Sequence, residues 1–149
     1  MSKYIKFLLQ AIALLSITLG VFSAQAMAKT NIQYEVINDD TLVLSGNGEA
    51  EEAIKYGKEV KKSQIKKLII KEGITKITPL GIGTFESVRE VVLPDSLTEI
   101  GDATFAGYYK LKKVRFGKGL QTIAYLAFAS CISLEEIDIP DSVVEIGAA

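Results

Sequence analysis

The sequence predicts a solenoid: a parallel stack of β-strands built from 23-residue units, with a β-hairpin and a helix capping its N-terminal end. Three observations lead to this prediction. An apolar pattern recurs every 23 residues from Ile65 to the end of the chain, without a gap. The preceding stretch, 31–64, lacks that pattern. It also has about 34 residues, too few for a stable domain of its own. A fixed period of this length is typical of repeats that bury their apolar faces only against their neighbours.

Five positions of the unit are apolar in all four copies, counting Ile65 as position one. They are position one (Ile65, Val88, Leu111, Leu134), position four (Leu68, Val91, Val114, Ile137), position six (Ile70, Leu93, Phe116, Ile139), position ten (Ile74, Leu97, Leu120, Val143) and position thirteen (Ile77, Ile100, Ile123, Ile146). Region 65–149 therefore holds three full units and a fourth that stops at position sixteen.

Each unit contains the signals of two short extended segments and a turn. Positions one to six predict a strand, which proline at position seven or glycine at position nine ends. Positions ten to thirteen predict a second extended segment. A small residue at position fourteen then leads into a helical or 3₁₀ turn, with an anchor at position eighteen (Ile82, Phe105, Phe128). In-register stacking of such units gives a parallel sheet along one face.

Residues 31–64 are predicted to cap this stack. Apolar and polar residues alternate from Ile32, and Asn38 to Asp40 supplies turn chemistry before the pattern resumes, as in a β-hairpin. The charged stretch from Glu49 to Gln64 predicts a helix with a thin apolar stripe. A solenoid needs its terminal apolar face covered, and the hairpin with the helix is placed to cover it.

Residues 1–28 have the form of a secretory signal peptide. Two lysines precede the apolar run from Phe7 to Phe22, and the small residues Ala26 and Ala28 each end a possible cleavage site. An uncleaved membrane anchor is the alternative, but a spanning helix needs about 20 apolar residues. The sequence therefore predicts an exported protein without stable membrane insertion after cleavage.

Charge and cysteine content restrict the possible partners. The whole chain has a net charge of −1, and removal of the two leader lysines takes it to −3. A mildly acidic surface argues against nucleic acid, which requires a basic stripe, and against electrostatic attachment to membranes. A single cysteine, Cys131, permits no internal disulfide.

The outward strand positions hold the candidate contact residues. Position five reads Ile69, Val92, Arg115 and Asp138, and position three reads Lys67, Glu90, Lys113 and Glu136. The alternating charges at position three are most simply a ladder of cross-strand ion pairs. The apolar residues at position five either favour the strand or form a contact surface. Tyr109 either binds protein or packs partly in its loop. The candidates for protein contact are Ile69, Val92, Lys113, Arg115 and Tyr109.

No catalytic, metal-binding or cofactor-binding site is predicted. The chain has no histidine, so it lacks the commonest general base and the commonest metal ligand. Cys131 has no histidine to activate it and is expected to be a buried small apolar residue.

The repeats resemble the BspA-like, or Treponema pallidum type, leucine-rich repeats. The pattern L-x-x-V-x-I-P-x-S-V-x-x-I-G-x-x-A-F-x-x-C is matched from Leu134 to Gly147, from Val88 to Phe105, and by Ala127 to Cys131. The cap segment Leu42 to Gly48 resembles the L-x-I-S-G-x-G motif with which members often open. The resemblance implies an exported or surface protein, and a protein ligand such as a host matrix or cell-surface protein.

The sequence departs from this pattern in two places. Pro79 and Leu80 follow Ile77 in the first unit, which predicts an irregular turn there. In the fourth unit the anchor at position eighteen is missing. Unpaired strand groups from Leu134 to Ile139 then predict self-association through the open C-terminal edge. The alternative function is a truncated structural fragment of a longer surface repeat protein.

Overall fold

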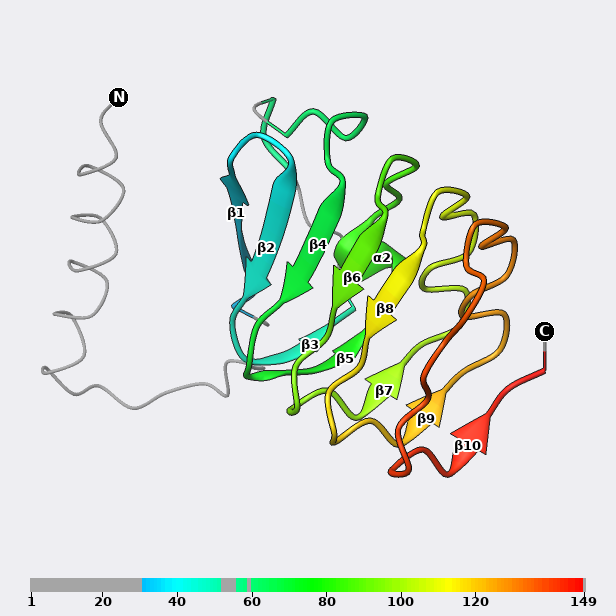
Figure 1. Ribbon diagram of the computed structural model, residues 1–149. Coiled ribbons are helices and arrows are strands. Elements are labelled where there is room, and N and C mark those ends of the chain that lie inside the picture. Colours follow the sequence, from blue (N-terminus) through cyan, green and yellow to red (C-terminus); the bar gives the residue numbers. More distant parts are fainter. Residues whose placement is uncertain (1–30, 52–55, 59, 149) are drawn as a thin grey trace, which may run out of the picture.

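The computed structural model describes residues 31–148 except 52–55 and 59, so the predicted signal peptide, 1–28, lies outside the described residues. Two five-stranded sheets run side by side along the stack (Figure 1). Sheet A contains β1 (Gln33–Ile37), β2 (Thr41–Ser45), β4 (Lys67–Ile70), β6 (Glu90–Val92) and β8 (Lys113–Arg115). Sheet B contains β3 (Gly48–Ala50), β5 (Ile74–Ile77), β7 (Glu99–Ile100), β9 (Thr122–Ile123) and β10 (Glu145–Ile146).

The predicted 23-residue register is confirmed in both sheets. In sheet A, Lys67 pairs with Glu90 and Glu90 with Lys113, all in parallel. In sheet B, Ile100 pairs with both Ile77 and Ile123. Each unit therefore forms one coil of the solenoid, and we number the units of 65–87, 88–110, 111–133 and 134–149 as coils one to four.

Burial of the repeated apolar positions falls off along the stack. In coils one and two all six inward positions, from one to eighteen, are at most 5% exposed. In coil three, Phe116 and Phe128 are only half-buried. In coil four, Ile139 and Ile146 are 41% and 59% exposed. Burial of the inward positions thus decreases toward the C-terminal end of the described stack, where coil four packs against coil three only.

Aromatic rings fill the end of the core beneath the turns, and side-chain hydrogen bonds link one turn to the next. Phe105 stacks on Phe128 with ring centroids 5.2 Å apart and meets Tyr108 edge-on at 5.4 Å. The Tyr108 hydroxyl donates a hydrogen bond to the carbonyl oxygen of Gly83, 2.8 Å away in the preceding coil. The Cys131 thiol lies at the same position one coil later and donates to the carbonyl oxygen of Phe105 at 3.2 Å. Position twenty-one therefore ties the turns of coils two and three to the turn of the preceding coil.

The turns after sheet B differ between coils. In coil one this turn is the short helix α2 (Pro79–Ile82), capped by the Thr78 hydroxyl, which accepts from the Gly81 amide at 3.3 Å. Coils two and three have Ala103 and Leu126 at the equivalent of Leu80, both with left-handed φ (53° and 56°), and no helix forms. The predicted irregularity at Pro79 and Leu80 is thus a helical turn, and Ile82 still takes the buried anchor position.

The solenoid begins one coil earlier than the sequence pattern indicated. The hairpin is present as predicted, with β1 antiparallel to β2. Beyond it, β2 pairs in parallel with β4, and β3 pairs with β5 across a bulge between Gly48 and Glu49. The Gly48 amide donates to the carbonyl oxygen of Gly73 at 2.9 Å. We call residues 42–50 coil zero.

The predicted helix from Glu49 to Gln64 was wrong at its first residues, and also at those of its last residues that the structure describes. Gly48–Ala50 is strand β3, and residues 56–64, apart from 59, form turns without a helix. Residues 52–55 lie outside the described part. The pairing of Ala50 with Ile77 buries the Ala50 side chain, and this burial outweighs the helix propensity of an isolated charged segment.

The predicted strand at Leu134 to Ile139 was also wrong. Within the described residues sheet A ends at β8, and in Figure 1 the orange chain passes β8 without forming a strand. Sheet B does continue to β10. Within the described residues only coil three packs against positions one to six of coil four, so less apolar contact holds this segment in a strand beside β8.

Replacing Phe105 with alanine should destabilise the fold by about 3–5 kcal/mol, because it removes a fully buried ring and leaves a cavity between coils. The exposed Tyr109, changed to alanine, is the control and should cost less than about 1 kcal/mol. Urea denaturation followed by circular dichroism measures both. Equal losses in the two variants would contradict the assignment of Phe105 to the core.

Candidate binding surface

The predicted position-five residues form one row across sheet A. Ile69 on β4 pairs with Val92 on β6, and Val92 pairs with Arg115 on β8. Ile69 and Val92 are half-buried, while Arg115 is exposed. On the other side of Ile69 the row meets Val43, which is buried. The structure thus brings three of the five candidate residues together on neighbouring parallel strands.

Charged side chains next to this row are linked across three strands. Lys67 Nζ lies 3.1 Å from a carboxylate oxygen of Glu90, and Arg115 Nε lies 3.0 Å from the other oxygen. The first contact confirms the predicted start of the position-three ladder. The second differs from the prediction, because the position-five residue Arg115 reaches Glu90 while Lys113 forms no ion pair among the described residues. Arginine's longer planar group spans the diagonal between neighbouring strands.

The remaining two candidates occupy different places. Lys113 is exposed on β8 and pairs in register with Glu90, so it borders the row. Tyr109 is 50% exposed in the loop that precedes β8, outside the strand row. Its backbone carbonyl accepts a hydrogen bond from the Ser133 hydroxyl at 2.6 Å. The candidate surface on sheet A therefore consists of Ile69, Val92, Lys113 and Arg115, without Tyr109.

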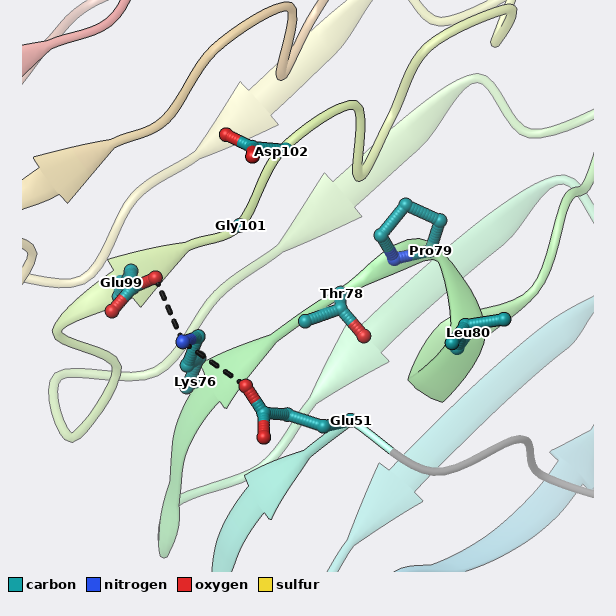
Figure 2. Close-up of a pocket in the computed structure, with 8 residues that line it drawn as sticks. All are labelled: Glu51, Lys76, Thr78, Pro79, Leu80, Glu99, Gly101 and Asp102. Carbon is teal, nitrogen blue, oxygen red and sulfur yellow. Dashed lines mark ion pairs between the residues drawn. The ribbon is translucent and has the colours of Figure 1, made fainter.

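Sequence reasoning missed a second ion-pair ladder on sheet B. Lys76 Nζ lies 3.0 Å from carboxylate oxygens of both Glu51 and Glu99, and Figure 2 shows the lysine between the two acids. These hydrogen bonds raise the pKa of Lys76 above its usual 10.5, with the bond to Glu51 contributing most. Lys76 and Glu99 both stand at position twelve of their units, so the 23-residue spacing could have predicted that they pair. The pairing of Glu51 with Lys76 was not predicted, because the segment that contains Glu51 was predicted to be a helix.

The second ladder forms one wall of a shallow groove of about 450 Å³. Pro79 and Leu80 line its other side, and Leu80 is 69% exposed (Figure 2). Lys76 is neutralised by its two partners, and Asp102 accepts a hydrogen bond from the Tyr125 amide at 3.0 Å. The charged groups of this groove thus hold neighbouring coils together.

Cys131 is buried, as expected, and is a free thiol. Burial raises the pKa of this thiol, so it stays protonated at neutral pH. Among the residues that the structure describes, no group of His, Cys, Asp and Glu has the arrangement of a metal site. No helix in this part of the chain has the length and apolarity needed to cross a membrane.

Comparison with known proteins agrees with this architecture. Residues 82–149 match a family model described as "BspA type Leucine rich repeat region (6 copies)". The chain is a BspA-type leucine-rich repeat protein. A search of curated protein sequences returns no match.

Three solved bacterial structures share the fold of this BspA-type protein. A leucine-rich repeat protein of Eubacterium ventriosum is 22% identical with a TM-score of 0.68, over 81% of this chain and 32% of that one. The T. pallidum leucine-rich repeat protein is 25% identical with a TM-score of 0.55, over 83% and 54%. A Bacteroides capillosus leucine-rich repeat protein is 28% identical with a TM-score of 0.52, over 77% and 82%. The chain therefore spans about a third of the length of the first protein and about half of the length of the second.

The raised pKa of Lys76 predicts how the second ladder depends on pH. A lysine whose pKa is raised by folding stabilises the fold fully below about pH 10.5, and this contribution is lost as the pH rises further. Wild type should therefore exceed Lys76→Met in unfolding free energy by up to about 1 kcal/mol near pH 8. This difference should shrink above pH 10.5. Urea titrations of both proteins at several pH values measure it, and a difference independent of pH would rule out the ladder.

Proposed function

We propose that this chain is an exported, non-enzymatic module that binds another protein through the outer face of sheet A. The observation that carries the proposal is the in-register row of Ile69, Val92 and Arg115 on three neighbouring strands. Half-buried β-branched side chains beside an arginine give the mixture of apolar area and charge that is enriched in the centres of protein interfaces.

The frame beneath this row supports the same proposal. Leu68 and Val91, which flank the row on the inward side, are fully buried. Side chains on strands with buried neighbours lose little further freedom on binding, so a flat contact face built on them has a small entropic cost. The Glu90 carboxylate also limits the motion of Arg115 by lying 3.0 Å from its Nε.

The predicted leader and the family point to the location and the class of ligand. A signal peptide at 1–28 would deliver the repeats to the cell surface or outside the cell. There a protein ligand, such as a host matrix or cell-surface protein, would meet sheet A. The absence of histidine from the sequence supports a binding role over a catalytic one.

The double variant Ile69→Asp/Val92→Asp should weaken binding to matrix proteins by about tenfold or more, because it places two charges in the centre of the contact face. Surface plasmon resonance against a panel of purified matrix proteins measures this loss. The control Thr98→Asp/Gln121→Asp adds the same charge at two exposed residues that directly precede strands β7 and β9 of sheet B, and should bind as wild type does. A second pair, Ile69→Thr/Val92→Thr, keeps the β-branched shape and tests for a loss caused by unfolding.

Two results would contradict the contact face. One is a ligand bound equally well by wild type and by the sheet A aspartate variant. The other is a ligand whose binding is lost only in the sheet B control. Circular dichroism of all three variants shows whether the fold is retained.

A further inference from the structure

Cations gather at the end of sheet A where its parallel strands begin. Strands β4, β6 and β8 run in the same direction, so their first residues lie together along one edge of the sheet (Figure 1). We call residues 64–67, 87–90 and 110–113 the basic edge. This edge has one acid, Glu90, and six basic residues: Lys66, Lys67, Arg89, Lys110, Lys112 and Lys113. Its net charge is therefore +5, whereas the whole chain has a net charge of −1.

Most of these cations have no partner of opposite charge. Glu90 lies 3.1 Å from Lys67 Nζ, and Asp40 lies 4.0 Å from Lys66 Nζ. The ion pairs described above link neighbouring coils, but they use only these two cations of the basic edge. The other four, which are exposed and form no ion pair among the described residues, are Arg89, Lys110, Lys112 and Lys113.

The backbone fixes the spacing of the cations at position two. The Arg89 amide donates to the carbonyl oxygen of Lys66 at 2.7 Å. The Lys112 amide donates in turn to the carbonyl oxygen of Arg89 at 2.8 Å. Three successive coils thus carry a cation at this position, about 4.8 Å apart. A partner whose acidic groups repeat at close to this interval can place one anion against each coil.

We propose that the basic edge binds a linear anionic polysaccharide that carries sulfate groups on its sugar rings. Successive six-membered rings of such a chain repeat at close to one strand spacing. An acidic peptide fits less well, because side chains on one side of an extended peptide repeat every about 6.6 Å. Nucleic acid needs a longer basic stripe than one edge of an acidic chain provides. This site borders the sheet A face at Lys113 and does not depend on the function proposed for that face.

An exposed aromatic ring lies next to these cations in the sequence. Tyr109 is 50% exposed and directly precedes Lys110. Its carbonyl oxygen accepts from the Ser133 hydroxyl at 2.6 Å, and its amide donates to the carbonyl oxygen of Gly107 at 2.8 Å, so its backbone is held in place. The electron-rich face of an aromatic ring attracts the C–H groups of a sugar ring. One coil earlier the equivalent residue is Glu86, so we place the polysaccharide over coils two and three.

The test uses a labelled, sulfated heparin octasaccharide, with its binding to the full chain measured by fluorescence anisotropy. Wild type should bind this probe, and a desulfated octasaccharide of the same length should bind at least about tenfold more weakly. The affinity for the sulfated probe should also fall as salt is raised from 50 to 300 mM, since exposed charges are screened.

The double variant Arg89→Gln/Lys112→Gln should bind the sulfated probe about tenfold more weakly, as expected for two exposed pairs. The control Lys71→Gln/Lys118→Gln removes the same charge from two exposed residues beyond the other ends of β4 and β8, and should bind as wild type does. Tyr109→Ala should bind about threefold more weakly with the same salt dependence, because it removes a ring and no charge.

No measurable binding of the sulfated octasaccharide would overturn the proposal, as would equal binding of both octasaccharides or equal losses in the two charge variants. Tighter binding of single-stranded DNA with the same number of charges would make nucleic acid the occupant, and would also overturn it. Unchanged binding by Tyr109→Ala would contradict the placement of the polysaccharide over coils two and three.

Discussion

Stacking of apolar side chains at 23-residue intervals is the constraint on which the rest of this structure depends. A single coil has no interior of its own, because its inward residues are covered only by the coils before and after it. Coils one and two, with neighbours on both sides, bury all six inward positions. Coil four, with one neighbour, leaves Ile139 and Ile146 exposed and loses its sheet A strand. The same sequence pattern therefore gives different local structure according to what lies beside it.

The register also decides where charges meet. Because the repeat length is constant, residues at one position of successive coils lie about one strand spacing apart, near 4.8 Å, and opposite charges at that position form ladders. Glu90 contacts charges from the coils on both sides, and Lys76 contacts Glu99 of coil two and Glu51, which directly follows coil zero. Each pair is exposed and contributes little to stability by itself. Their larger effect is to favour opposite charges on neighbouring coils.

The repeats could be predicted from the sequence because their signal is local and periodic. Ile77, Ile100 and Ile123 occupy equivalent buried places, as the pattern indicated. Coil zero was missed because its strands pair with those of coil one at offsets of 26 and 27 residues, outside the 23-residue period. Its segment also has helix propensity, which pairing with β5 overrides. The absence of a strand at Leu134 to Ile139 could not be read from residue types, since these match the earlier units and only their surroundings differ.

The candidate surface was predicted in part. The Ile69–Val92–Arg115 row follows from the period, and the structure places these residues side by side as expected. Sequence spacing could not show that Arg115 would reach diagonally to Glu90 in place of Lys113, because that choice depends on side-chain length and rotamer. Tyr109 was predicted to lie in a loop, and the structure places it in the loop that precedes β8.

Hydrogen–deuterium exchange of backbone amides, read by mass spectrometry, tests the dependence of each coil on its neighbours most directly. Exchange should be slow in β6, whose coil has neighbours on both sides, and faster in β8. It should be fastest at residues 135–139, whose amides have no backbone partner in the described structure. Equal, strong protection of residues 135–139 and β6 would contradict the account, because residues 135–139 would then be as well ordered as a strand that is paired on both sides.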